Sequence, residues 1–208
     1  MKTLFLSLFL VIGSFTSFAQ LPGFGIKGGV NFPRLSTSSQ NNDPYIIPST
    51  LTTFFVAAFI DFKFGNFSYQ PGVNFTGKGG QTFYKGLPAD GIDVTEKVKL
   101  YYLQVPMNVV YHLPVVIGNL YLGAGPYAAV GTSGKIKYLT SATSKSQDVK
   151  FGSNGDFKAT DFGAGIIAGF QFNTGLLIGL NYDLGLSNIS NDGNTKNRVF
   201  GVSAGFVF

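Results

Sequence analysis

Residues 175–188 read Gly-Leu-Leu-Ile-Gly-Leu-Asn-Tyr-Asp-Leu-Gly-Leu-Ser-Asn, and apolar and polar side chains alternate along them. Successive side chains of a β-strand point to opposite faces. One face would carry Leu176, Ile178, Leu180, Tyr182, Leu184 and Leu186, and the other would carry Gly179, Asn181, Asp183, Gly185 and Ser187. Leu177 breaks this alternation. An apolar face of eleven residues suits a tilted strand that crosses a hydrocarbon core, since strands of soluble proteins are about half as long. We therefore predict lipid against the first face and a packed polar interior behind the second.

Seven further segments show the same alternation. Their predicted outward faces occupy residues 24–32, 54–64, 67–75, 101–111, 120–130, 162–172 and 200–208. With a rise of about 3.3 Å per residue and a tilt of about 40°, such faces cover roughly the 25 Å apolar band of an outer-membrane barrel. The sequence thus predicts an all-β fold, an eight-stranded antiparallel up-and-down transmembrane β-barrel.

The connections between these segments alternate in length. Those at 65–66, 112–119 and 173–175 are short, whereas those at about 34–53, 77–99, 131–161 and 187–199 are long. Outer-membrane barrels have tight periplasmic turns and larger extracellular loops. An even number of strands then places both termini in the periplasm, and we expect the protein in the cell outer membrane.

Aromatic residues mark both ends of the predicted strands. The periplasmic set is Phe24, Phe64, Phe67, Tyr111, Phe172 and Phe208, and the outer set is Phe32, Phe54, Phe75, Tyr101, Phe162 and Phe200. Aromatic side chains prefer the interfaces of a membrane, so these two sets predict two girdles.

The composition agrees with a secreted β protein. Residues 1–19 form a predicted signal peptide, with Lys2, an apolar stretch at 4–12, and Ser17 and Ala19 before the cleavage site, which leaves residues 20–208 as the barrel domain. The 208 residues are 45% hydrophobic and 12% charged, with 28 glycines and 22 phenylalanines. No later apolar run reaches the length of a membrane helix. The absence of cysteine excludes disulfides, thiol ligands and attachment of lipid to an N-terminal cysteine.

The net charge of +5 comes from scattered lysines and does not suggest nucleic acid as a partner. Five of them lie in and beside one predicted loop: Lys135, Lys137, Lys145, Lys150 and Lys158. A solvated loop is one interpretation of this group. Contact with the anionic phosphates of outer-membrane lipopolysaccharide is the other.

Polar residues on the inward faces predict a hydrogen-bonded plug. The candidate network consists of Lys27, Asp61, Lys63, Gln104, Asn181 and Asp183. Buried charges must be paired, and an eight-stranded barrel is just wide enough inside for side chains. A stabilising network is the first interpretation, and a narrow ion or proton path is the alternative.

Several motifs resemble the PorT-like outer-membrane β-barrel family, which is common in Bacteroidetes. They are Phe24-Gly-Ile-Lys-Gly-Gly-Val-Asn-Phe32, Tyr102-Leu-Gln-Val-Pro-Met107, Gly123-Ala-Gly-Pro-Tyr127, Asp161-Phe-Gly-Ala-Gly165, Gly179-Leu-Asn-Tyr-Asp-Leu-Gly-Leu186 and Asn197-Arg-Val-Phe200. Gln104 departs from the family, whose members often have a glutamate there. The resemblance implies a barrel in the outer membrane, and some relatives are linked to type IX protein secretion. The C-terminal Phe206 and Phe208 resemble the signal that the barrel-assembly machinery reads.

Motifs for chemistry are weak. His112 is the sole histidine and lies at the predicted periplasmic end, too far from serines in extracellular loops for lipid-modifying catalysis. Residues 123–128 fit a dinucleotide pattern, but Pro126 and the continuing alternation favour a strand over the required helix. Asp90, Asp93 and Glu96 are a weak calcium possibility. We therefore predict no catalytic, cofactor or metal site.

The sequence favours a monomeric structural or interaction protein that offers its extracellular loops to secretion-system or cell-surface proteins. The most specific version of this interaction role is that of an accessory in protein secretion. A small-solute or ion channel is the alternative, and a lipid-modifying enzyme is the third.

Overall fold

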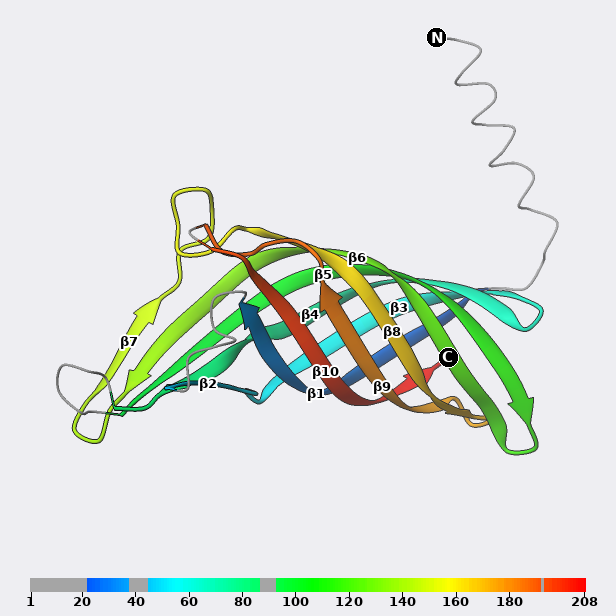
Figure 1. Cartoon of the computed structure of the whole chain (residues 1–208). Coiled ribbons are helices and arrows are strands. Elements are labelled where there is room, and N and C mark those ends of the chain that lie inside the picture. Colours follow the sequence, from blue (N-terminus) through cyan, green and yellow to red (C-terminus); the bar gives the residue numbers. More distant parts are fainter. Residues whose placement is uncertain (1–21, 38–44, 87–92, 192) are drawn as a thin grey trace, which may run out of the picture.

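A computed structural model describes residues 22–37, 45–86, 93–191 and 193–208 of the chain (Figure 1). These residues form ten strands: β1 (Gly23–Thr37), β2 (Ile46–Ser49), β3 (Thr53–Phe64), β4 (Phe67–Tyr84), β5 (Val94–Val115), β6 (Gly118–Leu139), β7 (Ser144–Asp148), β8 (Thr160–Phe172), β9 (Leu176–Gly185) and β10 (Thr195–Val207). No helix in the described ranges is long and apolar enough to cross a membrane. The predicted signal peptide at 1–19 lies outside these ranges.

Eight of the strands close a barrel. Each pairs antiparallel with its neighbours in the order β1, β3, β4, β5, β6, β8, β9, β10, and β10 returns to β1. The short β2 and β7 pair with the outer parts of β4 and β6. The predicted eight-stranded antiparallel barrel is therefore confirmed. Closure leaves none of these eight strands with an unpaired edge along the wall, which a sheet in lipid requires.

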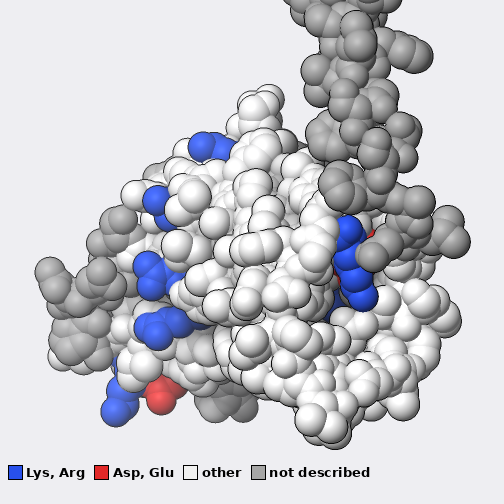
Figure 2. All heavy atoms as spheres, turned by 90° about the vertical axis from the view of Figure 1, so that its right-hand side faces the viewer, with Lys and Arg blue, Asp and Glu red and all other residues white. Residues whose placement is uncertain are grey.

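The barrel wall is apolar on its outside. On β9, Leu176, Ile178 and Leu180 are 45–49% exposed, whereas Leu177 is buried inside. Figure 2 views the molecule from one end of the barrel, where most of the visible surface is uncharged, basic side chains gather along the left edge and a second basic group lies right of the centre. The outward direction of the apolar faces is thus confirmed, and Leu177 breaks the pattern because it packs in the interior.

The two ends of the barrel differ. At one, here called the turn end, β3–β4, β5–β6 and β8–β9 are joined by two or three residues, and Phe208 donates its N–H to the carbonyl of Phe24. Gly65 and Gly175 in these turns have φ of 62° and 91°, a left-handed region that glycine enters without steric cost. The opposite end, here called the hairpin end, carries the long connections.

Aromatic rings form a belt near each end. At the hairpin end, Phe54, Phe75 and Tyr101 make a cluster with centroids 5.5–6.2 Å apart. At the turn end, Phe67 and Tyr111 are 5.0 Å apart. Offset and tilted rings at these separations attract one another beyond the area that they bury.

The predicted loops at 77–99 and 131–161 are largely strands instead. β4 runs to Tyr84, β5 begins at Val94, and β6 runs to Leu139, so β5 and β6 have 22 residues each. In Figure 1 these extensions project beyond the barrel with β7 beside them. They remain strands because they pair with one another outside the barrel wall, where water can replace lipid around them.

An apolar cluster, here called the cap, lies inside the hairpin end. Its buried members are Val98, Leu100, Tyr102, Tyr127, Ala129, Ile136 and Ile189, with Leu35, Val149, Phe151 and Phe157 packed against them. Loop residues 149–157 thus fold back over the ends of the strands. The cap closes the barrel at this end.

Candidate functional site

A buried ion pair lies beneath the cap. Lys78 on β4 donates to Asp161 on β8 at 3.0 Å, and both side chains are fully buried. Asp161 also accepts hydrogen bonds from Asn197 at 3.0 Å and Ser187 at 3.1 Å. A buried carboxylate is stable only when its charge is paired and its lone pairs are occupied, and these three donors meet both needs.

Two tyrosine rings complete the surroundings of this pair. The Lys78 ammonium lies 4.1 Å from the ring centroid of Tyr127 and 5.3 Å from that of Tyr102. A cation above an aromatic face is attracted by the ring quadrupole, most strongly where water is excluded. Lys78 therefore links β4, β5, β6 and β8 across the lumen.

Lys78 and Asp161 are not among the interior residues predicted from the sequence. Both fell in stretches interpreted as loops, one after Thr76 and the other before Phe162. The alternation of faces could have placed both residues inside. Thr76 points inward, so Lys78, two residues later, should also point inward; Phe162 points outward, so its neighbour Asp161 should point inward.

Four of the predicted network residues line one small cavity in the middle of the lumen. They are Lys27, Gln104, Asn181 and Asp183, around a space of about 30 Å³. The Gln104 amide donates to Asp183 at 3.0 Å. Lys27 is partly buried, 5.6 Å from the ring centroid of Phe59. A space of this size holds about one or two water molecules.

The other two predicted network residues lie apart, toward the turn end. Asp61 is buried, accepts a hydrogen bond from Gln70 at 3.1 Å, and has Lys63 at 3.9 Å. The Lys63 side chain is 44% exposed, so it lies at the mouth of the barrel. The six residues thus fall into two groups along the lumen.

His112 faces the interior. Its Nε2 is 2.9 Å from the hydroxyl of Ser68, and both residues are buried. His112 lies at the predicted periplasmic end and alternates with the outward Tyr111, which places its side chain in the lumen. A histidine beside a serine is the arrangement of an activated nucleophile. The cavity that His112 lines measures about 10 Å³, however, which admits at most one water and no acyl substrate.

The carboxylates considered for calcium have other partners. Asp93 accepts a hydrogen bond from the N–H of Gly86, and Glu96 accepts one from the hydroxyl of Tyr84 at 2.9 Å. Burial, followed by the charge of Glu96, raises the pKa of Tyr84 to about 12. Asp90 lies outside the described residues, within which no cluster of three metal-ligating side chains occurs.

The comparison with protein families identifies the class of barrel. Residues 18–191 match the family described as "Outer membrane protein beta-barrel domain". The chain belongs to this family. The predicted outer-membrane location is thereby confirmed. The match does not single out the PorT-like branch, and the search of curated proteins finds no match.

Solved outer-membrane barrels are similar to the chain at low identity. Ail of Yersinia pestis is 17% identical, with 91% of this chain and 100% of that one covered and a TM-score of 0.44. Neisserial surface protein A is 10% identical, with 89% and 97% covered and a TM-score of 0.46. OprG of Pseudomonas aeruginosa is 13% identical, with 91% and 97% covered and a TM-score of 0.37.

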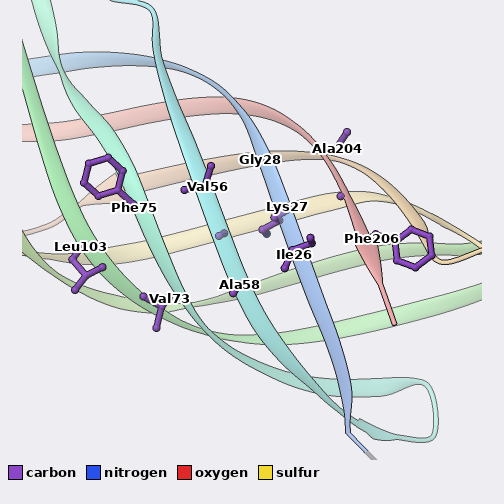
Figure 3. Close-up of a pocket in the computed structure, with 12 residues that line it drawn as sticks. Ile26, Lys27, Gly28, Val56, Ala58, Val73, Phe75, Leu103, Ala204 and Phe206 are labelled. Atoms are coloured by element: carbon purple, nitrogen blue, oxygen red, sulfur yellow. The ribbon is translucent and has the colours of Figure 1, made fainter.

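The outer wall of this outer-membrane barrel has a shallow apolar groove. It has a volume of about 670 Å³ and runs across β10, β1, β3 and β4 to Leu103 of β5. Figure 3 shows Ile26, Val56, Val73 and Phe206 around it, with the small Ala58 between them. The groove is open to the surroundings of the barrel. In a family of outer-membrane proteins, such a surface faces acyl chains.

Proposed function

We propose that this protein is a structural and interaction barrel of the outer membrane, acting through its surface at the hairpin end. The main observation that supports this proposal is the closed lumen. The cap and the Lys78–Asp161 pair fill the hairpin end. The two cavities described above, one lined by Gln104 and Asp183 and the other by His112, measure about 30 and 10 Å³. An interior filled by side chains favours stability over transport, as expected for eight strands.

The surface offered to partners is formed by the extended parts of β4, β5 and β6 with β7. All five residues of β7 are exposed. Cell-surface or secretion-system proteins are the proposed partners, with the barrel a monomer. The narrower role, an accessory of protein secretion, is supported by the motifs that resemble the PorT-like family. We further propose that the protein is not an enzyme and that the barrel-assembly machinery reads Phe206 and Phe208.

The orientation of the barrel can be tested by cysteine labelling, because the chain has no cysteine of its own. We propose that both termini are periplasmic and the hairpin end is outside the cell. Ser146→Cys on β7 should then react with a membrane-impermeant maleimide in intact cells. Val116→Cys in the β5–β6 turn, where the side chain is 95% exposed, should react after the outer membrane is permeabilised. The reverse pattern contradicts this orientation.

Planar-bilayer recording tests the closed lumen against the channel alternative. Purified barrel, reconstituted at a measured density, is expected to give no steady unitary currents, because apolar side chains of the cap pack together inside the hairpin end. Insertion is verified in the same bilayers by maleimide labelling of Ser146→Cys. Steady unitary currents that grow in number with protein density would support the channel instead.

A further inference from the structure

Four lysines share the outward face of the extended β5–β6 hairpin. Lys97 is directly opposite Lys137, and Lys99 is directly opposite Lys135. These four residues are here called the lysine quartet. Like charges in directly opposite positions of neighbouring strands destabilise a sheet. The hairpin therefore carries a repulsion that a bound anion would remove.

Acidic side chains offset little of this charge. Asp148 on β7 is the one acid among the described residues that line this surface, and its carboxylate is 3.6 Å from Lys135. Both side chains are well exposed, at 84% and 63%, so the pair is screened and weak. Glu96, the neighbour of Lys97 along β5, is bonded to Tyr84 instead.

The quartet surrounds a hollow just beyond the aromatic belt. The hollow has a volume of about 630 Å³, and Tyr101 and Ser133 also line it. Lys99 is two residues beyond Tyr101, or about 7 Å along the strand. Tyr101 stacks on Phe75 in the belt, with the rings 5.5 Å apart. The ammonium groups thus lie at the level of lipid headgroups, directly above a surface for acyl chains.

We propose that the lysine quartet binds the phosphates of an outer-leaflet lipid whose headgroup carries two phosphate groups, the chemistry of lipopolysaccharide. Each opposed pair of ammonium groups would hold one phosphate by charge-assisted hydrogen bonds. The acyl chains would lie against Tyr101 and Leu103, the latter 48% exposed on the wall below. The hollow and the aromatic belt share Tyr101, so a ligand that has both phosphates and acyl chains fits this surface better than a soluble anion does. The inference rests on the proposed orientation of the hairpin end.

Binding of purified barrel in neutral detergent micelles to fluorescent bis-phosphorylated lipid A tests the proposal. Lys97→Gln with Lys137→Gln should weaken binding roughly thirtyfold, at about 1 kcal/mol for each lysine. Lys99→Gln with Lys135→Gln should have a similar effect. The matched control, Lys145→Gln with Lys150→Gln, removes the same charge from exposed lysines outside the hollow and should change affinity less than threefold, on the order of 0.6 kcal/mol.

Thermal unfolding without lipid verifies that the variants fold. The quartet variants should unfold at the same temperature as the unsubstituted barrel or higher, because they remove the like-charge pairs. Equal binding of lipid A without phosphates, or an equal loss in the control variant, would refute the proposal. Displacement of the lipid by equimolar inorganic pyrophosphate would show a soluble-anion site and refute the lipid assignment. Binding in micelles does not depend on orientation in the cell, so failure here is distinct from failure of the labelling experiment.

Discussion

Replacing Lys78 by methionine is expected to lower the free energy of unfolding of the barrel by about 3–5 kcal/mol. The substitution leaves the Asp161 carboxylate buried with Asn197 and Ser187 but without a positive charge. An uncompensated buried charge costs far more than the lost hydrogen bond alone. Urea unfolding in phospholipid vesicles, followed by the change in electrophoretic mobility of the folded barrel, measures the difference.

Two further variants isolate the cause. Adding Asp161→Asn to Lys78→Met removes the orphaned charge and should recover most of the loss. Lys135→Met breaks the exposed ion pair with Asp148 and should cost less than about 1 kcal/mol. If Lys78→Met costs no more than Lys135→Met, the buried pair does not hold the hairpin end together.

The membrane-spanning part of the fold was predictable because lipid constrains it so strongly. Every outward residue between the two belts must be apolar, so the alternation on β9 from Leu176 to Tyr182 could be read without any partner strand. The closing contact between β1 and β10 then follows from the even strand count and the absence of edges in lipid. The sequence patterns alone thus predicted the barrel and its strand number.

Outside the membrane, the same strands reverse their polarity. Along β5 the outward residues change from Leu103 and Tyr101 to Lys99 and Lys97, while the inward ones change from Gln104 to the buried Leu100 and Val98. A search for outward apolar residues therefore stops at Tyr101, although the strand begins at Val94. The ion pair of Lys78 and Asp161 was missed because both residues lie where the outer surface of the strands passes from lipid to water.

The sequence predicted which residues face the lumen better than it predicted which of them contact one another. The alternation places Gln104 and Asp183 inside, but 79 residues separate them, and their contact depends on the register of every strand between. The same holds for Ser68 and His112, which are 44 residues apart. The period of two gives the face of a residue but not its height relative to distant strands.

Replacing Leu180 by arginine is expected to destabilise the barrel by about 2–4 kcal/mol in a lipid bilayer. Leu180 is 48% exposed on the outer wall, pairs with Val202 and Ala168, and lies between the two aromatic belts. An arginine there would place its charge near the centre of the hydrocarbon, where it loses hydration. Equilibrium unfolding in vesicles measures the change.

Leu186→Arg is the matched control, on the same face just past the end of β9. Leu186 is 57% exposed, and its N–H donates to the carbonyl of Phe162, a residue of the outer predicted girdle. An arginine at this position reaches the membrane interface and should therefore cost about 0–1 kcal/mol. The difference between the two variants measures depth in lipid, because the substitution is the same. In a wall exposed to water, both would cost little, and equal losses would contradict an outward lipid-facing surface on β9.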